Sequence, residues 1–194
     1  LQSSVVELFR QPDVLVRVGK TTGLTEAKSQ VVDGDKADLG RLVKRLTGDA
    51  KEPMKAVLTL TANRPQVQAQ QITSLRCDGD DWEATVDLLI NASRGVVDAL
   101  RLDVPASWSG PYKTTPPAVV DLVQNGKGDG GQLVVRPHSP IEGDYRIRIA
   151  GPLAVASGRP VGVPDIVLSG GSPVERFLVL PTQRQLQPIA WETR

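Results

Sequence analysis

WEATVDLLIN, residues 82–91, is the stretch that decides the fold class, because its polarity alternates with a period of two. Every second residue from Trp82 to Ile90 is apolar, and most of the residues between them are polar. This alternation is typical of a β-strand with one buried face. The residues just before it, 78–81, read Asp-Gly-Asp-Asp, a typical turn sequence. The segment therefore predicts a core strand that is entered through a tight turn.

The same alternation recurs on both sides of this stretch. It is found at residues 14–18, 58–61, 100–104, 133–135 and 145–149. Eighteen glycines and 15 prolines supply turn residues between these segments. The segments are not separated by repeated helical patterns, so a parallel α/β sheet is not expected. The sequence predicts an all-β protein of about ten strands, built as a β-sandwich or barrel, with at most one short helix.

One segment, residues 35–47, has a helical period instead. Leu39, Leu42, Val43 and Leu46 follow the spacing i, i+3, i+4 and i+7, and Asp35 is a candidate N-cap. The spacing predicts a short helix, with a strand as the competing interpretation.

Local turn signals predict two strand pairs and one loop. The apolar residues 5–9 and the alternating residues 14–18 flank Pro12-Asp13, which predicts a strand pair with a tight connection. Residues 166–168 and 177–180 flank a Gly-Gly-Ser-Pro turn, which predicts a hairpin. The glycine-rich residues 125–131 predict a flexible loop.

Composition excludes several classes of function. The formal net charge is +1, which provides no general attraction to nucleic acid or to anionic membranes. The chain has one Cys and one His, too few for a disulfide framework or a Cys/His zinc site. Its apolar runs are shorter than the roughly 18 residues of a spanning helix, so membrane insertion is not expected.

Candidate catalytic and metal-binding residues are few. His138 is the only histidine, it lies between prolines, and no Gly-x-Ser-x-Gly motif accompanies it. It is therefore interpreted as an exposed loop residue, and no catalytic residue and no cofactor are predicted. Asp78, Asp80 and Asp81 are a candidate calcium site, since Ca²⁺ prefers clustered oxygen ligands. The alternative is that these residues only form the turn before the core strand.

Trp108 and Tyr112 are the candidate ligand-binding residues. They lie together in the loop of residues 107–113, whereas the alternation assigns Trp82 and Tyr145 to the core. Loop aromatics on a rigid β-scaffold often bind ligands, and exposed rings would suit a carbohydrate. The competing hypothesis, which we prefer, is that Trp108 is mostly buried and that the pair plugs one end of the fold.

Residues 82–150 carry a family resemblance. The strand at 82–91 is followed by Leu-Arg-Leu-Asp-Val-Pro at 100–105 with Trp108 three residues on, and later by Gly-Asp-Tyr-Arg-Ile at 143–147. This order resembles the immunoglobulin-like accessory modules of bacterial secreted glycoside hydrolases and large surface proteins. The resemblance implies an antiparallel, immunoglobulin-like β-sandwich that has no catalytic residues of its own and is extracytoplasmic, either secreted or at the cell surface.

The expected domain organisation follows from the extent of this resemblance. Residues 81–194 are expected to form the immunoglobulin-like sandwich. Residues 1–80 are expected to be a β-rich region that either extends this sandwich or forms a second, smaller one. Because the chain starts at Leu1 and not at a Met, we expect it to be a piece of a longer polypeptide.

The expected function is that of a non-catalytic structural or interaction module in a larger extracytoplasmic protein. Its partners would be neighbouring domains or another protein. The alternative is a carbohydrate-binding module that uses Trp108 and Tyr112, and a third hypothesis is an enzyme domain of unknown chemistry.

Overall fold

The computed structural model describes residues 3–27, 40–124, 130–155, 160–170, 174–184 and 187–192. Within these ranges all regular structure is β-strand and no helix occurs, so the all-β prediction is confirmed. None of the described segments is a helix that could cross a membrane. The chain divides into two compact units, Leu1–Arg64 and Pro65–Arg194.

The first unit contains two small antiparallel sheets. Three strands form one sheet in the order β1-β4-β3, and two strands form the other. Their bounds are β1 (Ser3–Arg10), β2 (Val14–Thr22), β3 (Thr25–Glu26), β4 (Arg41–Asp49) and β5 (Lys55–Ala62). Leu46 is the only fully buried apolar side chain among the described residues of this unit, so its core is small.

The predicted helix at residues 35–47 is wrong where the structure describes it. Residues 41–47 belong to β4, while 35–39 lie outside the described residues. β4 pairs with β1 on one side and with β3 on the other. It begins after Gly40, whose φ is +82° and whose Cβ, if present, would lie 2.2 Å from the carbonyl oxygen of Arg10. Hydrogen bonding to β1 and β3 therefore makes this segment a strand, although its apolar residues have the spacing of a helix.

The predicted pairing of residues 5–9 with 14–18 is also wrong. The tight turn exists, because the Val14 N–H donates a hydrogen bond of 3.1 Å to the carbonyl oxygen of Gln11. However, β1 pairs with β4, and β2 pairs with β5. The turn therefore leads the chain from one sheet to the other.

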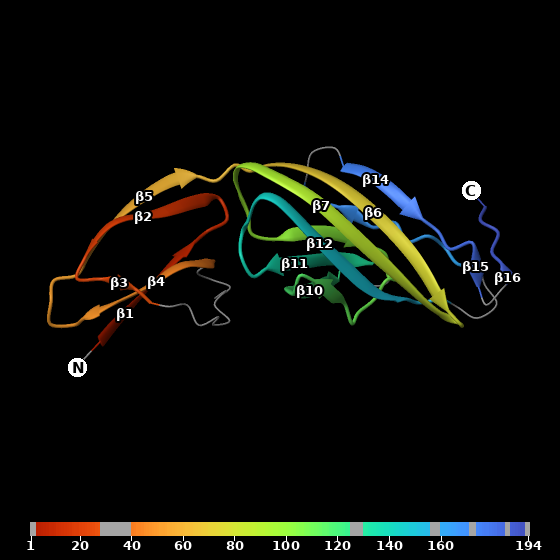
Figure 1. The fold of residues 1–194 in the computed structure, drawn as a ribbon, viewed down its shortest axis with the longest axis horizontal. Coiled ribbons are helices and arrows are strands. Elements are labelled where there is room, and N and C mark those ends of the chain that lie inside the picture. The colour runs from red at the N-terminus through yellow and green to blue at the C-terminus, as the bar shows by residue number, and fades with distance from the viewer. Residues whose placement is uncertain are drawn as a thin grey trace. The chain divides into compact units, whose positions relative to one another are not determined.

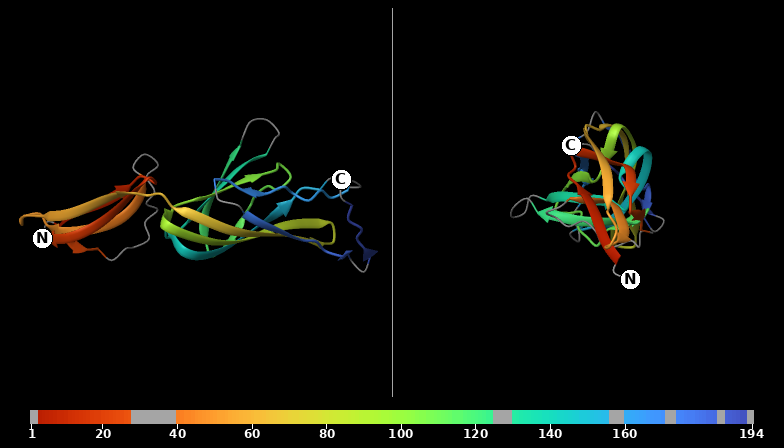
Figure 2. Two further views of the ribbon diagram at one scale, coloured as in Figure 1. Left: turned by 90° about the horizontal axis from the view of Figure 1, so that it is seen from above. Right: turned by 90° about the vertical axis from the view of Figure 1, so that its left-hand side faces the viewer.

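The second unit contains two larger sheets, which can be followed in Figures 1 and 2. One has the order β14-β6-β7-β12-β9 and the other β10-β11-β8-β13. All pairings in them are antiparallel except that of β14 with β6. The strands of the first sheet are β6 (Gln66–Asp78), β7 (Asp81–Val97), β9 (Lys113–Thr115), β12 (Ile141–Leu153) and β14 (Val174–Val179). Those of the second are β8 (Leu100–Val104), β10 (Ala118–Gln124), β11 (Gly131–Pro137) and β13 (Val167–Leu168), and a short hairpin of β15 (Gln183–Arg184) and β16 (Gln187–Pro188) follows.

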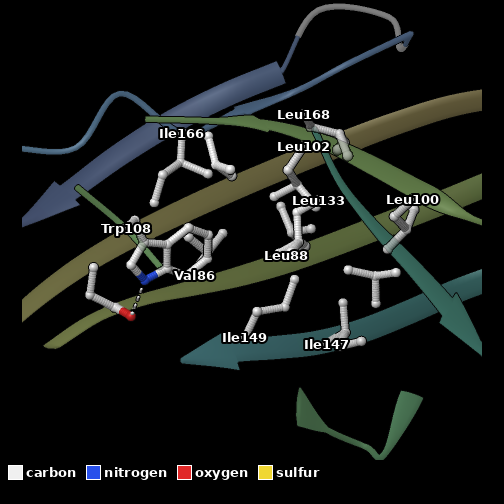
Figure 3. Close-up of a cluster of buried hydrophobic side chains, with 14 of the residues drawn as sticks. Val86, Leu88, Leu100, Leu102, Trp108, Leu133, Ile147, Ile149, Ile166 and Leu168 are labelled. Atoms are coloured by element: carbon white, nitrogen blue, oxygen red, sulfur yellow. Dashed lines mark hydrogen bonds between the residues drawn. The ribbon is translucent and has the colours of Figure 1, made fainter. Parts of the chain in front are cut away.

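Both sheets contribute to one hydrophobic core, which Figure 3 shows. Val86 and Leu88 of β7 lie in the same cluster as Leu102 of β8 and Leu133 of β11. Two sheets that bury their facing sides in one core are consistent with a β-sandwich. The predicted inward face of residues 82–90 is confirmed, whereas Tyr145, which was also assigned to the core, is half-buried.

The C-terminal segments pair differently from the prediction. β13 pairs with β8 and β14 pairs with β6, so residues 166–168 and 177–180 do not form a hairpin with each other. The two strands belong to opposite sheets of the unit. Of the predicted loop at 125–131, residues 125–129 lie outside the described residues.

The boundary between the two units also differs from the expected boundary, which followed residue 80. β6 pairs with β7 along its length, from Gln66 opposite Ser93 to Asp78 opposite Asp81. A boundary after residue 80 would separate these two strands of one hairpin. The two compact units instead meet between Arg64 and Pro65.

Neighbouring leucines of β7 give a matched test of this core. Leu88 is 0% exposed, whereas Leu89 points to the other face of the sheet and is 37% exposed. We expect Leu88→Ala to lower the free energy of unfolding by about 2–5 kcal/mol, the range for a buried leucine, and Leu89→Ala to lower it far less. Urea unfolding of both variants measures this. Equal losses in the two variants would contradict the assigned faces.

Candidate functional site

Trp108, the first candidate ligand residue, is buried. Its side chain is 1% exposed, and its Nε1–H points at the carbonyl oxygens of Ala84 and Gly151, at 3.2 and 3.1 Å. These carbonyls belong to β7 and β12, so the indole links two neighbouring strands at one end of the labelled core cluster (Figure 3). The prediction that Trp108 is mostly buried is confirmed.

Tyr112 packs onto this tryptophan. The two ring centroids are 5.0 Å apart at an interplanar angle of 72°, an edge-to-face arrangement. The Tyr112 hydroxyl donates a 2.7 Å hydrogen bond to the Trp108 carbonyl oxygen, and burial raises the pKa of Tyr112. Gly151 permits this close packing, because a Cβ there would lie 2.8 Å from Cδ1 of Tyr112. The pair therefore packs as a plug against the paired strands β7 and β12.

This geometry does not suit carbohydrate stacking. A sugar-binding platform needs an exposed ring face, and the Trp108 indole has none. A hollow of about 210 Å³ adjoins Trp108, smaller than the roughly 300–1,000 Å³ of typical small-molecule sites. A second, open hollow of about 460 Å³ in the first unit is lined by residues such as Thr25, Thr47 and Asp49, with no aromatic side chain among them.

The acidic candidates form a turn. Asp78 pairs with Asp81 across the β6–β7 hairpin, and Gly79 between them has a φ of +58°. Among the residues that the structure describes, no group of three or more His, Cys, Asp or Glu side chains is placed to hold a metal ion. Asp78, Asp80 and Asp81 are therefore not assembled into a calcium site there. His138 is exposed and follows β11.

An ion cluster on the outer face of the five-stranded sheet was not predicted. Asp87 of β7 is buried, and its carboxylate accepts hydrogen bonds of 3.0–3.2 Å from Arg148 of β12 and one of 3.5 Å from Arg146. The hydrogen bond and charge of Asp87 raise the pKa of Arg148. Asp87 and Arg148 are directly opposite in the β7–β12 register. The cluster thus fastens the two central strands together. In the sequence, Arg146 and Arg148 only alternate with the core residues of 145–149, which gives no sign of their distant partner.

β14 is the strongest candidate for an interaction site. It lies at the edge of the five-stranded sheet, and among the described residues it pairs only with β6 (Figure 1). Three consecutive apolar side chains are about half exposed: Phe177 at 52%, Leu178 at 48% and Val179 at 52%. An open, apolar sheet edge is a template for pairing with another strand.

The charged residues of β14 are already partnered within the chain. Arg176 donates to the Asp165 carboxylate at 2.6 Å and to the Ile166 carbonyl oxygen at 3.1 Å. Glu175 accepts a 2.8 Å hydrogen bond from Gln70 of β6. Arg176 is therefore paired with an opposite charge, whereas the carboxylate of Glu175 has a neutral amide as its hydrogen-bond donor.

The long edge strand of the other sheet, β10, is less suited. It also exposes apolar side chains, among them Val119, Leu122 and Val123. However, Asp121 lies in the middle of it and forms an ion pair with Arg136. Asp121 therefore separates Val119 from Leu122 and Val123 along β10. The apolar run of β14 is uninterrupted.

Comparison of the chain with models of protein families, with curated proteins and with solved structures found no match. The functional argument is therefore made from the geometry of the described residues.

Quenching of fluorescence tests the burial of Trp108. The chain has three tryptophans, so Trp82→Phe with Trp191→Phe leaves only Trp108. We expect iodide to quench this variant far less than free indole, because the anion cannot reach a buried ring. Quenching as strong as that of free indole, in a variant that is still folded, would contradict the plug.

The Tyr112 hydroxyl should affect both stability and its pH dependence. Tyr112→Phe removes the hydrogen bond to Trp108, which should lower the free energy of unfolding at neutral pH by about 0.5–1.5 kcal/mol. Because the pKa is raised in the folded state, the contribution of this tyrosine is complete below about pH 10, the unfolded value, and is lost as the pH rises through the folded value.

The variant should therefore lose less stability above about pH 10 than the unmodified chain, as measured by urea unfolding across this range. Tyr145→Phe is the control, since burial also raises the pKa of Tyr145 but its ring does not pack on Trp108. Identical pH profiles of the Tyr112→Phe variant and the unmodified chain would contradict the assignment.

Proposed function

We propose that the chain is a non-catalytic structural and interaction module of a larger extracytoplasmic protein. In this proposal its second unit is an immunoglobulin-like β-sandwich. The polar groups inside that unit support a structural role, because they hold the fold together. Nε1 of Trp108 links β7 to β12, and Asp87 fastens the same strands on the outer face. Nε2 of Gln71 ties β6 to the Ile166 carbonyl oxygen at 2.6 Å.

The observation that carries the interaction role is the open edge of β14. The backbone of an edge strand offers N–H and C=O groups to an incoming strand, and neighbouring side chains give selectivity. At β14 the incoming strand would meet Phe177 and Val179 on the outer face of the sheet and Leu178 on the other face. The partner is therefore an extended, apolar segment that adds to the five-stranded sheet.

Selection from a displayed library of random ten-residue peptides tests this function. We expect the chain to enrich peptides with alternating apolar residues, and Leu178→Lys to abolish their binding, because a lysine on an edge strand opposes pairing. Leu122→Lys in β10 is the matched control and should leave binding unchanged, since Leu122 is also exposed on an edge strand.

Failure to enrich such peptides would contradict strand addition. Enrichment of peptides whose binding is lost in the Leu122→Lys variant but kept in the Leu178→Lys variant would move the site to β10. Circular dichroism and urea unfolding of both variants establish that each is folded before binding is compared.

A further inference from the structure

Resting on the proposed structural role, we propose that the second unit withstands tension along the polypeptide through a shear clamp formed by β6 and β14. β6 is the first strand of this unit, and β14 is the last of its described strands that is longer than two residues. The two strands are neighbours in the five-stranded sheet and run parallel (Figure 1). Tension that enters at Gln66 and leaves after Val179 therefore passes directly from one strand to the other.

The direction of the two strands decides how their hydrogen bonds are loaded. In a parallel pair, the start of one strand and the end of the other lie at opposite ends of the ladder of bonds. Six residue pairs form this ladder, from Val174 opposite Ala69 to Val179 opposite Ser74. Tension pulls the two strands in opposite directions along their axes, so the bonds of all six pairs are strained together. Such shear resists force more than a geometry in which the bonds open one after another.

The core of the unit lies outside this load path. In the five-stranded sheet, β6 separates β14 from β7, and β12 lies beyond β7. The ladder to β6 is the only strand pairing of β14 among the described residues. The force at which the unit opens is therefore set by the clamp, and the core strands are loaded only after β6 and β14 have separated.

Side chains reinforce the clamp at two adjacent positions of the same register. Gln70, opposite Glu175, donates a 2.8 Å hydrogen bond to its carboxylate. Gln71 donates through Nε2 to the carbonyl oxygen of Ile166 at 2.6 Å, and Arg176, directly opposite Gln71, donates to the same oxygen at 3.1 Å. Because the Gln71 side chain is 0% exposed, water does not compete for its hydrogen bond. Both strands are thus also held through one shared acceptor.

The chain after β14 continues at the end of β6 that is remote from Gln66. The Sγ atom of Cys77 lies 3.8 Å from the carbonyl oxygen of Gln183, and Trp191 packs edge-to-face on Trp82, which is opposite Cys77 in the β6–β7 register. β15 and β16 pair antiparallel through two residue pairs only, which open one after the other when the end of the hairpin is pulled. Tension therefore releases this hairpin first and then loads β14 from its far end.

Pulling single molecules in two directions tests the clamp. Both set-ups use the full chain with the substitutions Cys77→Ser and Asp80→Cys, and the force at opening reports the rate of unfolding under load. In the shear set-up the chain is held at its two termini. In the peeling set-up it is held at its C-terminus and at residue 80, in the turn at the far end of β6, so that β14 is pulled from β6 one residue pair at a time. We expect a several-fold higher force in the shear set-up.

The length of chain that is released identifies the event. Separation of β6 from β14 in the shear set-up frees residues 66–179, a gain of roughly 35–40 nm at about 3.5 Å per residue. Opening of the first unit frees roughly 20 nm on the same scale, so the two events are distinguished. Urea unfolding of the same variant and of the unmodified chain is the control that the substitutions leave the unit folded. Because one variant serves both set-ups, a difference in force reflects direction and not overall stability.

Equal forces in the two set-ups, or a higher force in the peeling set-up, would overturn the clamp. The selection of peptides described above reads the open side of β14, which faces away from β6, and is therefore independent of this result. Enrichment of peptides together with equal forces would overturn the clamp alone. A direction-dependent force without enrichment of peptides would overturn strand addition and support the clamp.

Discussion

The pairing of β7 with both of its neighbours is the constraint on which the second unit depends. β7 lies between β6 and β12 and places Val86 and Leu88 at 0% exposure in the core that the two sheets share. Its other face is also partly covered, because the buried Asp87 carboxylate is held by the arginines of β12. Both faces of this strand thus contribute contacts, and its pairing with β6 and β12 fixes the register of the central strands.

The hydrogen bonding of the buried Trp108 side chain also depends on β7. Its indole nitrogen needs an acceptor when buried, and the Ala84 carbonyl of β7 and the Gly151 carbonyl of β12 supply it. Trp191 uses its own nitrogen in the same manner, on the Pro181 carbonyl oxygen, and packs edge-to-face on Trp82 at 6.1 Å. The indole nitrogens of Trp108 and Trp191 are thus hydrogen-bonded within the unit. The large apolar side chains that are exposed among the described residues of this unit lie mainly on the edge strands β14 and β10.

The sequence predicted what depends on local periodicity and missed what depends on distant partners. The alternation at residues 82–90 identified the core strand, and the spacing of Trp108 and Tyr112 identified a pair that packs together. The apolar residues within 41–47 have the spacing of a helix, but this segment pairs with β1 and β3 and is therefore a strand. The cluster of Asp87 with Arg146 and Arg148 was not predicted, because these arginines lie about 60 residues away from Asp87 along the chain. The Gly-Gly-Ser-Pro turn predicts a hairpin that includes β14, but its parallel pairing with β6 has no local signal in the sequence.

Amide hydrogen exchange is the most direct test of the claim that β7 is fully engaged while β14 is open. In dilute solution we expect the amides of residues 84–90 to exchange only through global unfolding, because both neighbouring strands cover them. The amides of residues 174–179 should exchange fastest among the long strands of the five-stranded sheet, and their protection should rise only when another strand is supplied. Protection of β14 equal to that of β7 in the dilute chain would show that its edge is already covered, and would contradict the account.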